Sequence, residues 1–410
     1  MSRNFELLSP AGNLEKMKTV YHYGADAVYL GGRAFNLRAA SHNFSKDELI
    51  EAVEYAHSIG KKVYVALNII AHNREIKALP QFIKFLEEAK VDAVIVADLG
   101  VMSLVKENSK LPIHISTQAS TANWAAVKMY KELGAKRVVL ARECSLSEIR
   151  QISKNVPGIE LETFVHGSMC MTYSGRCMLS QYMTSRDGNR GSCSNSCRYK
   201  YSLQEEKRPG EYYPVYEDET GSYIYNSKDL CTVDFLDEIL DAGVHTLKIE
   251  GRMKTMFYGA TVTRVYRQAL DAYKRGEFKQ NPLWREELEA ISNRRYTTGF
   301  FFGELDKNCQ NFEGGYTRKK DYVGSIRENL GGGEYLLDVR GRRITPGQKI
   351  EWLSPKGDIK EIEMPELISV KNGQPLDVVN PGMSAKIKLD MDFEPFDILQ
   401  TDADVVDSNY

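Results

Sequence analysis

Short apolar runs alternate with longer amphipathic segments over the first 250 residues of the chain. The runs are rich in β-branched residues, which is typical of buried strands. The segments between them, such as 46–60 and 79–91, place apolar residues at the spacing of one helix face. Several segments end in Gly-Ala or Gly-Val, as expected where a helix C-cap leads into a buried strand. The runs predict strands at residues 5–8, 27–30, 62–67, 93–96, 113–116, 137–140, 161–165 and 245–249.

Eight strand units separated by helical segments predict an α/β fold, a (β/α)8 barrel of the TIM type, rather than an open doubly wound sheet. No GxGxxG phosphate loop follows the first strand, which argues against a dinucleotide-binding fold. The barrel domain is expected to span residues 1–310. A long insertion is expected at about residues 166–231, between the seventh strand and the helix that follows it.

The pattern changes at about residue 320. From there the apolar positions alternate at period two, and Gly-rich or Pro-Gly turn signals separate the runs. This pattern predicts a second domain at residues 320–402, a small antiparallel β-barrel. Small barrels often bind RNA, although a fold alone does not establish a function.

Composition narrows the class of protein. The 410 residues are 42% hydrophobic and 27% charged, and the net charge is −2, so any surface that binds nucleic acid must be a local patch. The N-terminal residues lack the apolar core of a signal peptide, and no apolar run approaches the ~18 residues that a membrane span needs. A cytoplasmic protein without a membrane partner is therefore expected.

Five of the seven cysteines lie between residues 170 and 231, while Cys144 and Cys309 stand alone. Clustered thiols in a cytosolic chain more often bind metal than form disulfides. Thiolate ligands at long spacings favour an iron–sulfur cluster, and zinc or reduced structural thiols are the alternatives. Cys231 is expected to open the helix that follows the insertion. The five are Cys170, Cys177, Cys193, Cys197 and Cys231.

Charged side chains gather just beyond the ends of the expected strands, where a barrel places its chemistry. Guanidinium groups match carboxylate and phosphate, so arginines here indicate an anionic substrate, although such residues can also serve only as caps. Glu143 and Glu250 are candidates for proton transfer because of their position. The candidate substrate-binding residues are Arg33, Arg38, Arg142, Lys248 and Arg252.

Residues 162–180, ETFVHGSMCMTYSGRCMLS, resemble the signature of peptidase family U32. The downstream segments GSCSNSCRYKY, NSKDLC and LKIEGRMK are also similar to that family. The resemblance runs from about residue 5 to residue 303. Several motifs in register are far more specific than any one of them.

The members that the chain resembles most are linked to 5-hydroxyuridine formation at the wobble position of tRNA, and they require prephenate. The resemblance therefore implies a tRNA-modifying hydroxylase whose partners are tRNA and the anionic metabolite prephenate. A ferredoxin-type protein is a further candidate partner, as the electron donor. Related members carry a 4Fe–4S cluster. Its ligands correspond to Cys170, Cys177, Cys193 and Cys231, with Cys197 as the alternate fourth ligand.

Two other functions fit the same residues. One is a hydroxylase of ribosomal RNA or of a quinone-type ring, and the other is a non-catalytic RNA-binding scaffold with a structural cluster. The peptidase activity that the family name suggests is not expected. The sequence has no HExxH motif, no GxSxG elbow and no evident Cys–His or Ser–His–Asp arrangement.

Overall fold

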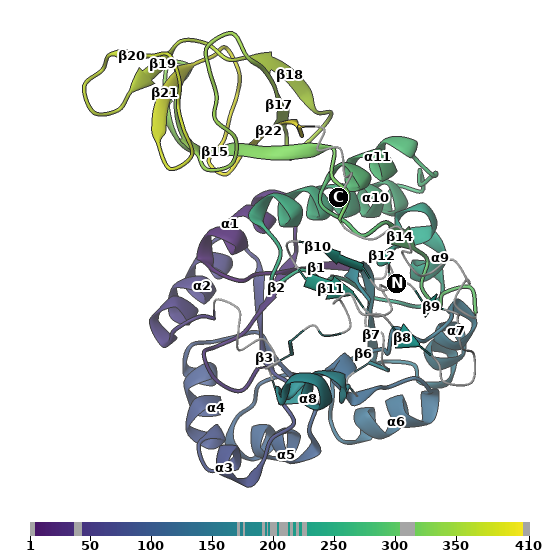
Figure 1. The fold of residues 1–410 in the computed structure, drawn as a ribbon. Helices are drawn as coiled ribbons and strands as arrows, with labels where there is room; N and C mark the ends of the chain where they lie inside the picture. The colour runs from purple at the N-terminus through teal and green to yellow at the C-terminus, as the bar shows by residue number, and fades with distance from the viewer. Residues whose placement is uncertain are drawn as a thin grey trace.

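Figure 1 shows the computed structural model of the chain, in which a barrel lies beside a smaller sheet domain. Among the helices of the described residues, none combines the length and the apolar character that crossing a bilayer requires. The structure describes residues 5–36, 43–169, 173–174, 177–190, 193–194, 196, 203–204, 212–213, 216–218, 221–223, 228–303 and 316–404.

Eight parallel strands form a closed barrel. They pair in the order β13-β1-β2-β3-β4-β5-β6-β7, and β13 also pairs with β7, which closes the ring. The helices lie around the outside of this ring (Figure 1). The predicted (β/α)8 barrel is therefore confirmed. The barrel strands are β1 (Glu6–Pro10), β2 (Ala27–Leu30), β3 (Lys62–Leu67), β4 (Ala93–Val96), β5 (Ile113–Ile115), β6 (Arg137–Val139), β7 (Glu160–Ser168) and β13 (Thr246–Ile249).

Many helices begin at a residue whose side chain caps the first turn. Ser45 and Ser145 form capping boxes with the glutamates three residues later, at the starts of α2 and α7. Asp98 and Thr255 cap α5 and α10 in the simpler way, through one side-chain oxygen. The α-helices are α1 (Leu14–His22), α2 (Lys46–Ser58), α3 (Asn73–Ile76), α4 (Leu79–Glu88), α5 (Leu99–Asn108), α6 (Trp124–Glu132), α7 (Leu146–Asn155), α8 (Leu179–Thr184), α9 (Leu236–Asp241), α10 (Met256–Lys274) and α11 (Pro282–Ala290).

The seventh strand is longer than the sequence pattern predicts. Its end pairs antiparallel with β12 (Asp229–Cys231), and β12 pairs in turn with β14 (Tyr296–Thr297). Cys231 is therefore the last residue of a strand, and the expectation that it opens a helix is wrong. The reason is that the chain returning from the insertion finds its backbone partners on the extension of β7, where Cys231 pairs with His166. Helix α9 begins only at Leu236.

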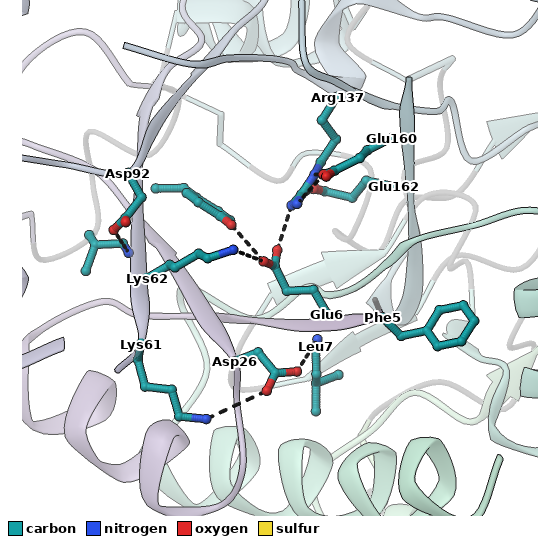
Figure 2. A network of polar contacts seen from close by, with 12 residues as sticks. Phe5, Glu6, Leu7, Asp26, Lys61, Lys62, Asp92, Arg137, Glu160 and Glu162 are labelled. Atoms are coloured by element: carbon teal, nitrogen blue, oxygen red, sulfur yellow. Dashed lines mark hydrogen bonds and ion pairs between the residues drawn. The ribbon is translucent and has the colours of Figure 1, made fainter. Parts of the chain in front are cut away.

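Charged groups fill the amino end of the barrel interior (Figure 2). Arg137, the first residue of β6, donates to Glu6 of β1 at 2.7 Å and to Glu162 of β7 at 3.2 Å. The other carboxylate oxygen of Glu162 accepts from Lys248 Nζ of β13 at 2.7 Å, and all four side chains are buried. The network therefore joins the two strands whose pairing closes the ring.

Tyr64, Lys62 and His114 complete this network. The Tyr64 hydroxyl donates to Glu6 at 2.8 Å, and Lys62 lies 3.4 Å from the same carboxylate. Burial and the nearby cations lower the pKa of His114 well below its ordinary value, so this ring is neutral. Buried charges cost several kcal/mol unless they are paired, so each group here depends on its neighbours.

The second domain is an eight-stranded antiparallel sheet rolled into a half-barrel (Figure 1). Its order is β18-β17-β22-β15-β16-β21-β19-β20, and its inward side chains form a separate apolar core. The predicted antiparallel domain is thus confirmed as a fold. The strands are β15 (Lys320–Gly331), β16 (Glu334–Val339), β17 (Lys349–Leu353), β18 (Lys360–Glu363), β19 (Leu367–Ser369), β20 (Pro375–Leu376), β21 (Ser384–Lys388) and β22 (Ile398–Asp402).

Buried polar contacts join the two domains. The Nε of Arg264, on α10, donates to the Ser354 carbonyl at 2.6 Å, and this arginine is almost fully buried. The Tyr23 hydroxyl donates to the Leu353 carbonyl at 2.6 Å and accepts from the Ile398 amide at 3.0 Å. These contacts place the half-barrel against α1 and α10, beside the barrel.

Replacing Arg137 by methionine should strongly destabilise the protein, because the buried carboxylates of Glu6 and Glu162 then lose their shared cation inside the barrel. The half-exposed Glu160 loses the same partner. The free energy of unfolding should fall by about 3–5 kcal/mol, as when one partner of a buried pair is removed. Urea denaturation measures the change. The matched control is Arg150→Met, whose exposed pair with Glu238 should contribute less than about 1 kcal/mol. Equal losses in both variants would contradict a role for the buried network.

The difference in the free energy of unfolding between wild type and Arg137→Met should also depend on pH. Burial alone raises the pKa of Glu6, but Arg137 and the other hydrogen-bonding groups outweigh this, so the pKa lies below 4.5. A lowered carboxyl pKa stabilises the folded state above the unfolded pKa, and the contribution is lost as the pH falls through the folded pKa. The wild type should therefore exceed Arg137→Met in free energy of unfolding by most above pH 4.5, and this difference should become smaller in acid.

Candidate active site at the barrel mouth

Cys177 and Cys193 are held in one hydrogen-bonded segment of the insertion. The Cys177 amide donates to Asn189 Oδ1 at 3.2 Å, and Asn189 Nδ2 donates back to the Cys177 carbonyl at 2.7 Å. The Ser180 and Ser194 hydroxyls lie 2.8 Å apart and are buried, which ties the start of α8 to the residue after Cys193. Local side-chain bonds therefore hold the peptides next to both cysteines. Cys170 and Cys197 lie outside the described residues.

Cys231 is a buried free thiol at the junction of β12 and β7. Burial raises its pKa to about 11. The Tyr266 hydroxyl, from α10, lies 3.9 Å from its sulfur and also donates to the Val165 carbonyl at 2.7 Å. His166, beside it, has its pKa lowered to about 3 by burial and is neutral. The barrel thus fixes the backbone of Cys231 at the end of β7.

The described part of the chain holds no group of three His, Cys, Asp or Glu side chains that could bind a single metal ion. Zinc takes thiolate ligands at about 2.3 Å, and a four-iron cluster takes one thiolate on each of its irons. Cys177, Cys193 and Cys231 supply thiol donors of the kind that either group takes, and the cluster stays a prediction.

Glu143 anchors the cysteine segment to the mouth of the barrel. Its Oε1 accepts from the Ser174 amide at 3.0 Å and from the Ser174 hydroxyl at 3.4 Å. The Ser120 hydroxyl, beyond β5, donates to the Ser174 carbonyl at 2.5 Å. Ser174 lies three residues before Cys177 and is buried. The buried Oε2 of Glu143 has no hydrogen-bond partner among the described residues, so one oxygen remains for a further donor.

Glu250, the other candidate for proton transfer, lies just past β13. Its Oε2 accepts from the Tyr29 hydroxyl at 3.2 Å, and its carbonyl accepts from the Tyr258 hydroxyl at 3.1 Å. Its amide donates to the His166 carbonyl at 2.9 Å. The carboxylate therefore points back over the barrel interior. Its role in proton transfer stays a prediction.

Arg142, just beyond β6, has its guanidinium over an aromatic ring. Its guanidinium carbon lies 3.7 Å above the Phe164 ring centre, a cation–π contact at the end of the barrel interior. No carboxylate of the described residues forms an ion pair with it. Its side chain is partly exposed, so a ligand at the mouth can reach the charge.

The other predicted substrate-binding residues have different surroundings. Arg252 is buried and donates to the side-chain oxygens of Asn36 at 3.3 Å and Asn43 at 2.8 Å, in the connection after β2. Arg33 lies on the same connection and is exposed, and Arg38 lies outside the described residues. Lys248 is buried below the mouth with its ammonium paired to Glu162, so its charge already has a partner.

Sequence reasoning missed the small polar residues that organise the mouth. Ser120 and Ser174 connect two strand ends to the insertion, and Asn36 and Asn43 orient Arg252. Serine and asparagine are common in loops, so their type alone carried no signal. The strained backbone of Ser120, with a φ of 53°, could not be read from the sequence either.

The family model described as peptidase family U32 matches residues 12–311, and the model of the family's C-terminal domain matches residues 318–400. The chain belongs to peptidase family U32. It is 38% identical over 396 residues to tRNA hydroxylation protein P of Escherichia coli (strain K12), covering 86% of this chain and 87% of that protein. It is 39% identical over 406 residues to tRNA hydroxylation protein P1 of Bacillus subtilis (strain 168), covering 96% and 94%.

The U32 family also contains a ribosomal RNA hydroxylase. The 23S rRNA 5-hydroxycytidine C2501 synthase of Escherichia coli (strain K12) is 36% identical over 288 residues, which cover 70% of this chain and 42% of that protein. Relatives that act on RNA therefore include proteins named for tRNA and for ribosomal RNA. The two tRNA hydroxylation proteins match this U32 chain over most of its length.

Replacing Glu143 by alanine should loosen the cysteine segment, because the Ser174 amide then loses its acceptor. A buried donor left without a partner costs about 1–3 kcal/mol, so hydrogen exchange at Ser174 should speed up about tenfold or more. Glu143→Gln keeps one acceptor oxygen and should show a smaller effect. The control is Glu107→Ala, which removes only an exposed contact to Ser103. Unchanged exchange in Glu143→Ala would mean that Glu143 is not the anchor.

Proposed function

We propose that this U32 protein hydroxylates the wobble uridine of tRNA to 5-hydroxyuridine, with prephenate and a 4Fe–4S cluster. The single observation that carries the proposal is the Glu143–Ser174 anchor, which ties the cysteine segment across the barrel mouth beside Arg142. A substrate held at the mouth then lies next to the cysteines. The tRNA hydroxylation proteins that match most of this chain support the choice of reaction.

Cys170, Cys177 and Cys193 would hold the cluster together with Cys231, and Cys197 is the alternate to Cys231. When bound, the cluster supplies a centre for electron transfer or Lewis-acid catalysis, and a ferredoxin-type protein is the expected electron donor. Asn189 and Ser180 keep the Cys177 segment in place by hydrogen bonds. The antiparallel pairing of β12 with β7 fixes the backbone of Cys231.

Prephenate would bind through its carboxylates to the arginines at the strand ends. One guanidinium neutralises one carboxylate, so a dicarboxylate needs cations from at least two strands. Arg142 follows β6 and Arg252 follows β13, and Asn36 and Asn43 hold the Arg252 guanidinium in place. Glu143 and Glu250 lie at the ends of these same strands and are the groups able to take up a proton there.

A uridine inside the anticodon loop is already unpaired, so extruding it into the mouth costs less than extruding a base from a duplex. The barrel interior below the mouth is closed by Phe164, Tyr29 and the charged network, which leaves the mouth as the reaction space. Ribosomal RNA is the second candidate substrate. The 5-hydroxycytidine synthase in the same family favours it, although that protein matches over less than half of its own length.

Deleting the gene should abolish 5-hydroxyuridine in tRNA, and mass spectrometry of tRNA and ribosomal RNA nucleosides measures the outcome. The wild-type gene should restore the nucleoside, and so should Cys144→Ala, because that buried cysteine lies outside the cluster set. Cys177→Ala should fail to restore it and should lose iron from the anaerobically purified protein. Normal tRNA with altered ribosomal RNA in the deletion strain would transfer the function to the second substrate.

The content of iron and acid-labile sulfide in the anaerobically purified protein also tests which cofactor is present. About four of each per chain are expected in the wild type, as a cubane cluster requires. Cys231→Ser should lose more iron than Cys197→Ser, because β12 fixes the backbone of Cys231 at the barrel. Stoichiometric zinc without sulfide would contradict the cluster.

Arg142→Met should weaken prephenate binding by about 2 kcal/mol, the loss expected for a hydrogen bond between charged groups. Iron content should not change, because Arg142 is not a ligand. Calorimetry measures the affinity, and Arg150→Met on the exposed face of α7 is the control. Wild-type affinity in Arg142→Met and in Arg252→Met would place the prephenate site elsewhere.

A further inference from the structure

Large apolar side chains are exposed around the barrel mouth, where a folded domain normally has polar groups. Tyr182 of α8 has 88% of its surface exposed, and Trp124, the first residue of α6, has 45%. Tyr173, next to the Ser174 anchor, is 51% exposed. We call these three side chains the aromatic rim. Met178 and Met253, at 66% and 60%, lie on the same end of the barrel.

Topology places the aromatic rim on one face. Trp124 follows β5, and Tyr173 and Tyr182 belong to the insertion that follows β7. Connections that follow the carboxyl ends of parallel barrel strands all lie at the same end of the barrel. In the view of Figure 1, α8 lies at the edge of the opening of the ring, and α6 lies on the outside of the ring. The aromatic rim therefore borders the same mouth as Arg142, which follows β6.

Exposed cations accompany the aromatic rings. Lys128 lies four residues after Trp124 on α6, so both side chains occupy the same helix face. Lys128 is 59% exposed, and its ion pair with Glu132 is long, at 3.9 Å. Arg186 is exposed just beyond the end of α8, and Arg33 is exposed in the connection after β2. The face thus combines flat aromatic surfaces with positive charges that the net charge of −2 does not reveal.

This combination suits unpaired RNA better than a protein partner. Single-stranded bases stack on exposed aromatic rings, and neighbouring cations contact the phosphates. The core of a protein interface is depleted of charged residues. Here the exposed rings are accompanied by the exposed cations Lys128 and Arg186.

We propose that the aromatic rim stacks unpaired bases of the tRNA anticodon loop while Lys128 and Arg186 contact its phosphates. This inference rests on the proposed function, because it names how the same mouth receives its RNA. Bases beside the wobble uridine stack on Trp124 and Tyr182, and the uridine itself enters the mouth toward Arg142. The half-barrel domain lies outside the ring, next to α1 and α10 (Figure 1).

The test measures the affinity of the full-length protein for a fluorescent anticodon stem–loop by anisotropy at fixed salt. Tyr182→Ala and Trp124→Ala should each weaken binding about tenfold, within the range found for one base–aromatic stack. Tyr182→Phe keeps the ring and should bind like wild type. The matched control is Leu133→Ala, an exposed apolar residue at the opposite end of α6. Lys128→Ala and Arg186→Ala should each make the dependence of affinity on salt less steep.

Wild-type affinity in both alanine variants overturns the inference, and so does an equal loss in Leu133→Ala. Unchanged RNA affinity combined with lost 5-hydroxyuridine would assign the rim to a protein partner instead. The nucleoside analysis of the deletion strain separates this result from a failure of the proposed function. A deletion strain whose tRNA still contains normal 5-hydroxyuridine disproves the proposed reaction. Wild-type RNA affinity in the alanine variants disproves only the role of the aromatic rim.

Discussion

The carboxylate of Glu162 is the interaction on which the rest of the barrel depends. It accepts from Arg137 of β6 and from Lys248 of β13, and it stands on β7 between them. These three strands include the pair that closes the ring, so closure and charge neutralisation occur together. Because these charges are buried, no member can lose its partner without a large cost. These contacts close the amino end of the barrel and make it rigid. The candidate reaction site is therefore confined to the opposite end.

The extension of β7 connects this rigid part of the barrel to the cysteine-bearing insertion. Past the barrel, β7 pairs with β12, so the exit of the insertion is bound to the same strand as its entrance. Between these points, Glu143 and Ser120 hold Ser174 over the ends of β5 and β6. Among the described residues, the insertion is therefore attached to the barrel at both ends and, between them, through Ser174. In the proposed function, this arrangement keeps a cluster and a bound substrate at a constant separation.

The half-barrel domain is attached in a different way. Arg264 and Tyr23 reach from the barrel helices to backbone carbonyls of the second domain, and both side chains are buried. Buried polar contacts of this kind cost energy when they are broken, so the two domains are expected to keep one relative orientation. The contacts lie on α1 and α10, outside the ring (Figure 1).

The sequence alone determined the barrel, because eight apolar runs and the helical segments between them repeat often enough to specify a ring. It also determined which residue types stand at the strand ends, including Arg142 and Glu143. Tertiary structure decided their roles, since contacts such as Lys248 with Glu162 join residues 86 positions apart. The three-residue strand that ends at Cys231 is too short to show a period, and only its pairing with β7 defines it. Glu143 was predicted from its position, but only the fold brings Ser174 to it, because the strand register sets that distance.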